Sequence, residues 1–74
     1  MMGWERQIDE ELTEAGVSGY VMSSNTDAEG KTVITMTIDG RTASGPPELF
    51  LSVIEDVKQN IPITQALESR EMFD

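Results

Sequence analysis

The clearest pattern of hydrophobic and polar positions lies near the middle of the chain, in residues 31–41. Ile34, Met36 and Ile38 alternate there with threonine and aspartate, which is the period of a strand with one buried face and one exposed face. We therefore expect this segment to form the central strand of a sheet, against which the rest of the chain packs.

Turn signals on both sides of the central strand predict its two neighbours. Asp39-Gly40 tolerates two positive φ angles, so the chain can reverse in a two-residue turn and return along residues 41–44. Before the strand, residues 27–30 predict a type I turn that ends in a left-handed glycine. This turn follows a first strand expected over residues 17–26.

The turn lengths also predict the register of the three strands. The expected pairs are Asp27 with Lys31, Tyr20 with Ile38, Met22 with Met36, Ser24 with Ile34, Met36 with Ala43, and Thr37 with Thr42. A first loop one residue longer or shorter would place Val21 on the core face and turn Tyr20 toward water. We prefer the first register because it buries the larger aromatic area. The open face of the sheet then carries Thr35, Thr37 and Thr42.

Amphipathic helices are expected before and after the sheet, at residues 4–15 and 47–60. The apolar positions of the first recur at three- and four-residue steps: Trp4, Ile8, Leu12 and Ala15. The second has a wider apolar stripe: Leu49, Phe50, Val53, Ile54 and Val57. Leu51 falls off this stripe, so we expect it either to be exposed or to contact a part of the chain that this pattern does not place. Trp4 and Tyr20 lie on apolar faces without neighbouring cations, which favours core packing over base stacking.

The predicted fold class is α+β. A helix, a three-stranded antiparallel meander and a second helix (αβββα) form one small domain over residues 1–62, with both helices on one face of the sheet. Residues 63–74 are expected to be a tail, either a short helix or a segment that orders only against a partner.

The element order between Glu11 and Val57 resembles the topology of the double-stranded-RNA-binding domains. That family grips phosphate with a lysine-rich start to its last helix. The corresponding residues 46–50, Pro-Pro-Glu-Leu-Phe, carry negative charge and no lysine. We therefore expect no direct binding of nucleic acid, even if the topology is shared.

Composition narrows the possible chemistry. The 74 residues include 14 acids and 5 bases, with a net charge of −9, and contain no cysteine or histidine. Disulfides and the usual zinc, haem and iron–sulfur sites are therefore excluded, and we expect no cofactor. The charge favours a basic protein partner, although a solvated surface and adaptation to high salt are alternative explanations. No apolar run approaches a membrane span and the N-terminus lacks the order of a secretion signal, so we expect a cytoplasmic protein that does not bind membranes.

The sequence offers little support for a metal site or a catalytic site. Residues 25–30, Asn-Thr-Asp-Ala-Glu-Gly, resemble the opening half of an EF-hand calcium loop, but the family's twelfth-position acid is replaced by Met36. We expect a plain hairpin turn there and no metal. No histidine can act as a general base, and no serine has a local base to activate it. We therefore expect a protein that is not an enzyme.

Two surfaces are candidates for partner binding. An acidic face on the first helix, continued on the second, comprises Glu5, Asp9, Glu10, Glu11, Glu14, Glu55 and Asp56. An apolar set, expected to be exposed, comprises Leu51, Leu67, Met72 and Phe73.

The acidic face supports the leading hypothesis, a module that occludes a basic surface of a protein partner. In its nucleic-acid-mimic form, the carboxylates of Glu10, Glu11 and Glu14 stand in for phosphates, as in inhibitors made by phages and mobile elements. The apolar set supports the alternative, an assembly protein that acts as a homodimer or as a small subunit of a complex.

Overall fold

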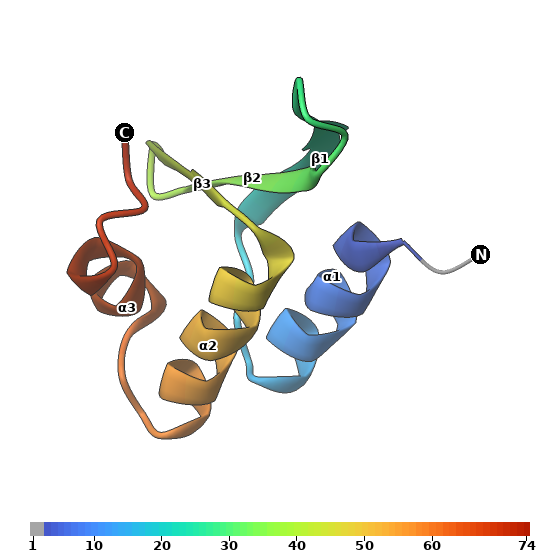
Figure 1. The fold of residues 1–74 in the computed structure, drawn as a ribbon. Coiled ribbons are helices and arrows are strands. Elements are labelled where there is room, and N and C mark those ends of the chain that lie inside the picture. The colour runs from blue at the N-terminus through green and yellow to red at the C-terminus, as the bar shows by residue number, and fades with distance from the viewer. Residues whose placement is uncertain (1–2) are drawn as a thin grey trace.

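The computed structural model describes residues 3–74 and contains one sheet and three helices (Figure 1). The elements follow in the order α1 (Trp4–Glu14), β1 (Tyr20–Thr26), β2 (Thr32–Ile38), β3 (Arg41–Gly45), α2 (Pro47–Lys58) and α3 (Ile63–Ser69). The strands pair antiparallel in the order β1-β2-β3. All three helices lie on the same side of the sheet, below it in the view of Figure 1. The predicted α+β fold is confirmed, with α3 as an additional helix.

The register of the sheet is the predicted one. Tyr20 pairs with Ile38 and Met22 with Met36, and Ala43 lies across from Met36 on the other side. In the β2–β3 turn, Asp39 has a φ of 52° and Gly40 a φ of 75°, as a two-residue hairpin turn requires. The hydrophobic pattern therefore predicted which side chains of each strand share a face.

The β1–β2 turn is also the predicted one, and Asp27 organises it. The Gly30 amide donates to the Asp27 carbonyl, and the Asp27 amide donates to the Lys31 carbonyl. One carboxylate oxygen of Asp27 accepts from the amides of Glu29 and Lys31, both at 2.9 Å. The residues that resemble half of a calcium loop thus use this oxygen to close a hairpin.

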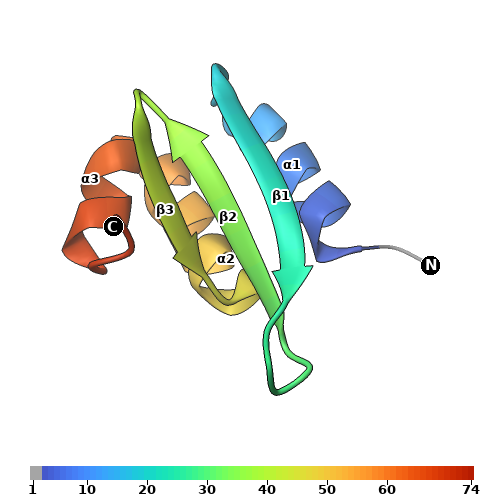
Figure 2. The same ribbon diagram turned by 90° about the horizontal axis from the view of Figure 1, so that it is seen from above.

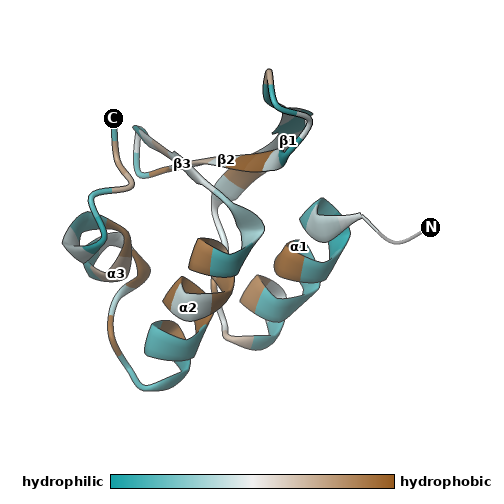
Figure 3. Ribbon diagram, in the orientation of Figure 1, coloured by the Kyte–Doolittle hydropathy of each residue, from teal (hydrophilic) through white to brown (hydrophobic). Residues whose placement is uncertain are grey.

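The core lies between the sheet and the helices. Its buried side chains are Ile8, Leu12, Ile34, Met36, Ile38, Ala43, Phe50, Val53, Ile54, Ala66, Leu67 and Met72. The hydrophobic part of α1 is turned toward α2 (Figure 3), and α1 itself buries only Ile8 and Leu12. The remaining surface of α1 is therefore free for polar residues.

The expected burial of Trp4 and Leu49 is wrong, and Leu51 follows the second of its two alternatives. Trp4 is 38% exposed, because it is the first residue of α1 and lies beside Pro46, Pro47 and other residues at the rim of the core. Leu49 is 36% exposed, whereas Leu51 is half-buried against the core. The reason is that α2 packs against α3 as well as against α1 and the sheet, so its buried arc is displaced from the predicted stripe.

The last twelve residues fold back onto the domain. Leu67 is fully buried and Met72 is 4% exposed, so the expectation that these two side chains are exposed is wrong. Phe73 pairs with Ala43 at the outer edge of β3. The Ser44 amide donates to the Met72 carbonyl at 3.0 Å, and the Asp74 amide donates to the Thr42 carbonyl at 2.9 Å. The chain end thereby covers the β3 edge of the sheet.

No helix in the described part of the chain has the length and apolar character needed to cross a membrane.

Candidate functional site

The acids predicted to form one face are spread around the exposed arc of α1. Glu5 and Asp9 are turned toward β1, where they accept hydrogen bonds from Ser24 and Tyr20. Glu10 lies 3.6 Å from Arg6 on the solvent side. Successive helix positions are about 100° apart, so the five acids of α1 extend from the edge of β1 around to the side facing α2.

At the seam between α1 and α2, one lysine lies among three carboxylates. The Lys58 ammonium donates to Glu11 at 3.0 Å. This hydrogen bond raises the pKa of Lys58, with further contributions from the charges of Glu11, Glu55 and Glu14. Glu55 of α2 thus acts on the same lysine as the acids of α1, and α1 and α2 are packed against each other.

Asp56 does not belong to this surface. Its carboxylate lies 2.7 Å from the Arg70 guanidinium, and both side chains are about three-quarters buried. Arg70 also donates to the carbonyls of Ala66 and Ser52. Asp56 points toward the end of α3 because it lies one residue, or about 100°, beyond Glu55 on α2. The pair braces α2 against α3 and is therefore structural.

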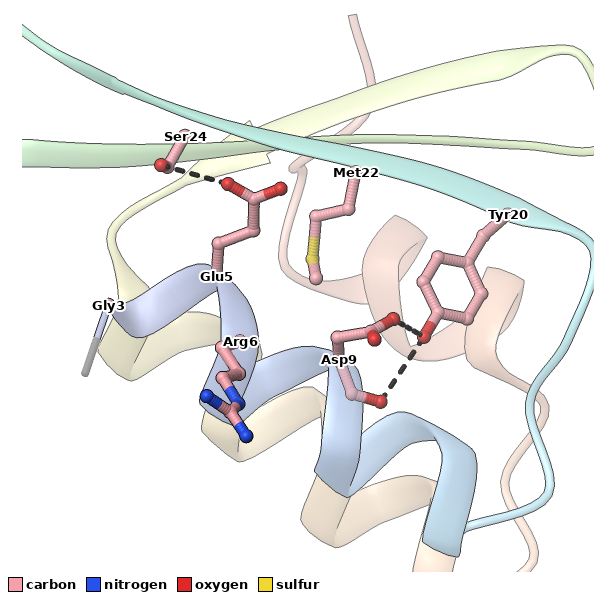
Figure 4. A pocket seen from close by; sticks show the side chains of 7 residues that line it. All are labelled: Gly3, Glu5, Arg6, Asp9, Tyr20, Met22 and Ser24. Carbon is pink, nitrogen blue, oxygen red and sulfur yellow. Dashed lines mark hydrogen bonds between the residues drawn. The ribbon is translucent and has the colours of Figure 1, made fainter.

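A groove of about 460 Å³ runs between α1 and β1 (Figure 4). It is lined by Gly3, Glu5, Arg6, Asp9, Tyr20, Met22 and Ser24. Two side-chain hydrogen bonds join its walls. The Ser24 hydroxyl donates to Glu5 Oε1 at 3.2 Å, and the Tyr20 hydroxyl donates to Asp9 Oδ1. Met22 projects toward α1 between these two bonds (Figure 4).

The electrostatics of the groove are dominated by its carboxylates. Glu5 and Asp9 have only neutral hydrogen-bond partners, and Arg6 lies 3.6 Å from Glu10. Burial raises the pKa of Tyr20 above its usual value, and the hydrogen bond to Asp9 raises it further. Tyr20 therefore stays neutral and keeps donating its proton to Asp9 throughout the physiological pH range.

A smaller hollow of about 240 Å³ lies at the other side of the α1 start. Its lining comprises Trp4, Lys31, Thr32, Pro46, Pro47 and Glu48. One lysine and one glutamate give it no dominant charge.

Sequence reasoning missed Tyr20 and Ser24 as parts of a polar groove, because both were assigned to the core face. Both side chains do lie on the core-facing side of β1, but they also border the groove. At the edge of a sheet, the core-facing side of a strand still borders solvent, and a hydroxyl there can meet polar groups from a helix. The signal was the coincidence of hydroxyl residues on the outermost strand with acids on one side of α1.

The alternative, apolar surface is not present as expected. Leu67 and Met72 are buried, and Leu51 and Phe73 are packed against the core. The large hydrophobic side chains that are exposed within residues 3–74 are Trp4, Val21 and Leu49. These three lie on α1, β1 and α2 respectively, and the groove contains none of them.

No group of three or more acidic side chains among residues 3–74 is arranged to hold a metal ion. No protein-family model matches this chain, and neither curated proteins nor solved structures show a significant match to it.

Proposed function

We propose that this protein is a small, acidic, non-enzymatic binding module that occludes a basic surface of a protein partner. The observation that carries the proposal is the set of carboxylates that the chain's own cations leave uncompensated on and beside α1. Arg6 and Lys58 pair with Glu10 and Glu11. Within the described residues, Glu5, Asp9, Glu14 and Glu55 have no ion-pair partner.

The rigidity of α1 supports this proposal. Ile8 and Leu12 anchor the helix in the core, and the Tyr20 and Ser24 hydroxyls fasten its outer side to β1. Carboxylates on an anchored helix lose little conformational entropy when they meet a cationic surface. Their summed field also steers a basic partner toward this side of the molecule. A nucleic-acid mimic, in which these groups replace phosphates, is the narrower form of the proposal.

The assembly hypothesis receives less support. Its apolar set is used inside the monomer, where Leu67 and Met72 are buried and Phe73 covers the β3 edge. A homodimer formed through these side chains would require the tail to leave the core. We therefore favour the acidic surface as the binding surface.

The test is affinity capture from a lysate of the source cells, followed by titration of the captured protein. The variant Glu14→Gln/Glu55→Gln removes two uncompensated carboxylates outside the groove. The control Glu29→Gln/Glu71→Gln removes the same charge from exposed sites on the β1–β2 turn and beyond α3. We expect the first variant to bind about fivefold more weakly at low salt, because each exposed charge pair contributes up to ~1 kcal/mol.

The captured protein should be basic and should dissociate at high salt, since salt screens exposed charges. In the mimic form of the proposal, it should also lose its nucleic-acid binding when this protein is added. Equal affinities for the two variants, or a complex that resists high salt, would contradict the proposed function.

A further inference from the structure

The two edges of the sheet differ in whether their backbone groups are used. Residues 72–74 bond to Thr42 and Ser44 at the outer edge of β3. Within residues 3–74, no backbone group bonds to the outer side of β1. β1 is therefore an open edge strand of seven residues.

The register identifies which peptide groups are free. The two-residue turn pairs Ile38 with Arg41, so the peptide groups of Ile38 point toward β3. In an antiparallel ladder, bonding alternates between the two sides of a strand. Tyr20, which lies opposite Ile38, therefore directs its N–H and C=O away from β2. The same holds at every second residue, Met22 and Ser24.

The sequence of β1 lacks the usual protection of an open edge. Tyr-Val-Met-Ser-Ser-Asn-Thr contains no charged residue and no proline, whereas natural edge strands are commonly blunted by lysine, proline or a bulge. The register of β1 against β2 is continuous over all seven residues, so no bulge interrupts it. An extended chain can therefore pair along the whole strand.

The groove lies directly below this edge. α1 runs alongside β1 (Figure 2), and the side chains of Tyr20, Met22 and Ser24 form the strand side of the groove (Figure 4). Side chains of paired strands that lie opposite each other share a face. Residues of an added strand opposite Tyr20, Met22 and Ser24 would thus place their side chains into the groove.

The groove chemistry determines which side chains fit. Opposite Tyr20 and Ser24, an incoming side chain meets the carboxylates of Asp9 and Glu5. Opposite Met22, it meets a thioether between them. We infer that the β1 edge and this groove bind an extended segment of the partner with the pattern basic-x-apolar-x-basic, which adds a fourth strand to the sheet. This inference rests on the proposed function, and it specifies the docking site and the form of the ligand.

A second copy of the chain fits this site less well. Its own β1 contains no basic residue, and each copy carries a net charge of −9. Pairing two β1 edges would bring two acidic grooves together, and like charges at short range oppose association. The charge of the groove therefore favours a basic segment over self-pairing.

The probe for this site is a synthetic peptide, Ser-Arg-Thr-Leu-Thr-Arg-Ser, titrated into the isotope-labelled full chain. We expect changes in the amide signals of Tyr20, Met22 and Ser24 and of the first turns of α1. A scrambled peptide with adjacent arginines should bind more weakly, because its basic side chains cannot both face the groove. The absence of these changes at millimolar peptide would overturn the inference.

Two substitutions at one position separate backbone pairing from side-chain contact. Ser24→Pro removes an outward-pointing N–H without removing a bond to β2, and it also removes the hydroxyl. Ser24→Ala removes the hydroxyl alone. We expect the proline variant to bind the peptide about tenfold more weakly than the alanine variant, as for one lost hydrogen bond. Equal affinities in two variants with cooperative thermal melts would exclude strand addition at β1.

A charge comparison separates failure of the docking site from failure of the proposed function. Glu5→Gln/Asp9→Asn should weaken peptide binding about fivefold, whereas Glu14→Gln/Glu55→Gln should leave it nearly unchanged. If the peptide responds to neither pair while capture of the basic partner still depends on Glu14 and Glu55, the docking site is wrong and the proposed function stands. If the signals of β1 change with protein concentration alone, a second copy occupies the edge and the inference is overturned.

Discussion

At the β3 edge of the sheet, Met72 and Asp74 form backbone hydrogen bonds with Ser44 and Thr42, and the side chain of Met72 is buried. At the β1 edge, the peptide groups of every second residue remain without a partner in the described chain, and an acidic groove lies below them. Both are outer strands of the same small sheet. The β3 edge is covered by residues 72–74, whereas the β1 edge is open.

The comparison shows that a segment of three residues is enough to cover the edge of a strand in this sheet. Residues 72–74 complete the β3 edge with two backbone hydrogen bonds, and Arg41 stacks on Phe73 with 3.9 Å between the guanidinium carbon and the ring centre. Open edges carry a risk of aggregation, which proteins usually limit with charge or proline. Strand addition uses an exposed sheet edge together with pockets that receive alternate side chains of the added strand, and the β1 edge with its groove has this arrangement. The contrast thus supports a binding role for β1.

The largest expected effect contrasts a buried side chain near the closed edge with an exposed side chain on the open strand. Leu67, on α3 beside the closed edge, is fully buried, whereas Val21 on β1 is 73% exposed. Leu67→Ala should lower the free energy of unfolding by about 2–5 kcal/mol through lost burial and a residual cavity. That loss is comparable with the total stability of a domain of this size, roughly 3 to 5 kcal/mol. Val21→Ala should change the unfolding free energy by less than about 0.5 kcal/mol.

Chemical denaturation of the two variants, followed by tryptophan fluorescence, measures this contrast directly. A small effect of Leu67→Ala would mean that α3 contributes little to the core. In that case residues 63–74 would be available to a partner, as in the assembly hypothesis.

Deleting residues 72–74 should convert the closed edge into a second open one. The deletion removes the burial of Met72, the two bonds to Thr42 and Ser44, and the stacking on Arg41. We expect a loss of about 2–3 kcal/mol, mostly from the methionine side chain. Hydrogen exchange should accelerate most at the Ser44 amide, which loses its acceptor. Peptide binding at β1 should survive, because the groove lies at the opposite edge.

The partly buried ion pair between α2 and the end of α3 should stabilise the fold more than the exposed ion pair on α1, by a smaller amount than the effects above. Asp56 and Arg70 lie 2.7 Å apart with side chains 26% and 24% exposed, whereas Arg6 and Glu10 lie 3.6 Å apart with side chains 71% and 58% exposed. Asp56→Asn should cost about 1 kcal/mol, because a guanidinium that is largely removed from solvent loses its counter-charge. Glu10→Gln should cost no more than about 0.5 kcal/mol.

A thermal melt of each variant at low and high salt checks this order. Only the Glu10 pair should lose most of its effect in salt, since exposed charges are screened more strongly than partly buried ones. Equal costs would show that Asp56 is as solvated as the acids of α1.

The sequence predicted the sheet well and its surroundings less well. Alternation in Ile34, Met36 and Ile38, together with two well-defined turns, determined the register, because a slip of one residue would reverse every side chain. Helix α1 was predictable because Ile8 and Leu12 recur at helical spacing. The packing of α3 was not predictable, because seven residues are too few for a hydrophobic period to emerge.

For the candidate site, the sequence predicted that the acids of α1 form a charged surface. It did not predict which acids of the two helices form ion pairs and which do not. Glu11 turns toward Lys58 and Asp56 toward Arg70, and these partners lie far away in the sequence. The groove depends on where α1 lies relative to the outer strand, which is a tertiary property. Residues 72–74 cover the β3 edge, so β1 is the open edge. No local sequence pattern indicates which of the two edges is covered.

The smallest effect concerns the hydrogen bond that ties the groove walls together. Burial, followed by the bond to Asp9, raises the pKa of Tyr20 above its usual value near 10. The folded state thus holds the phenol proton more tightly than the unfolded state. Its contribution to stability is complete below about pH 10 and is lost as the pH rises through the folded-state pKa.

Tyr20 is the sole tyrosine of the chain, so ultraviolet absorbance of tyrosinate reports this group alone. Asp9→Asn should move the titration toward lower pH but not to the value of a free tyrosine, because burial, the largest single cause, also raises the pKa of Tyr20. The pKa of Lys58 is also raised, so deprotonation of Lys58 lowers the stability of the folded state over a similar range of alkaline pH. The decline that is specific to Tyr20 is therefore the difference between the wild-type protein and Tyr20→Phe. Parallel stability curves for these two proteins above pH 10 would show that the hydroxyl does not join β1 to α1, and the groove would lose one of its two cross-links.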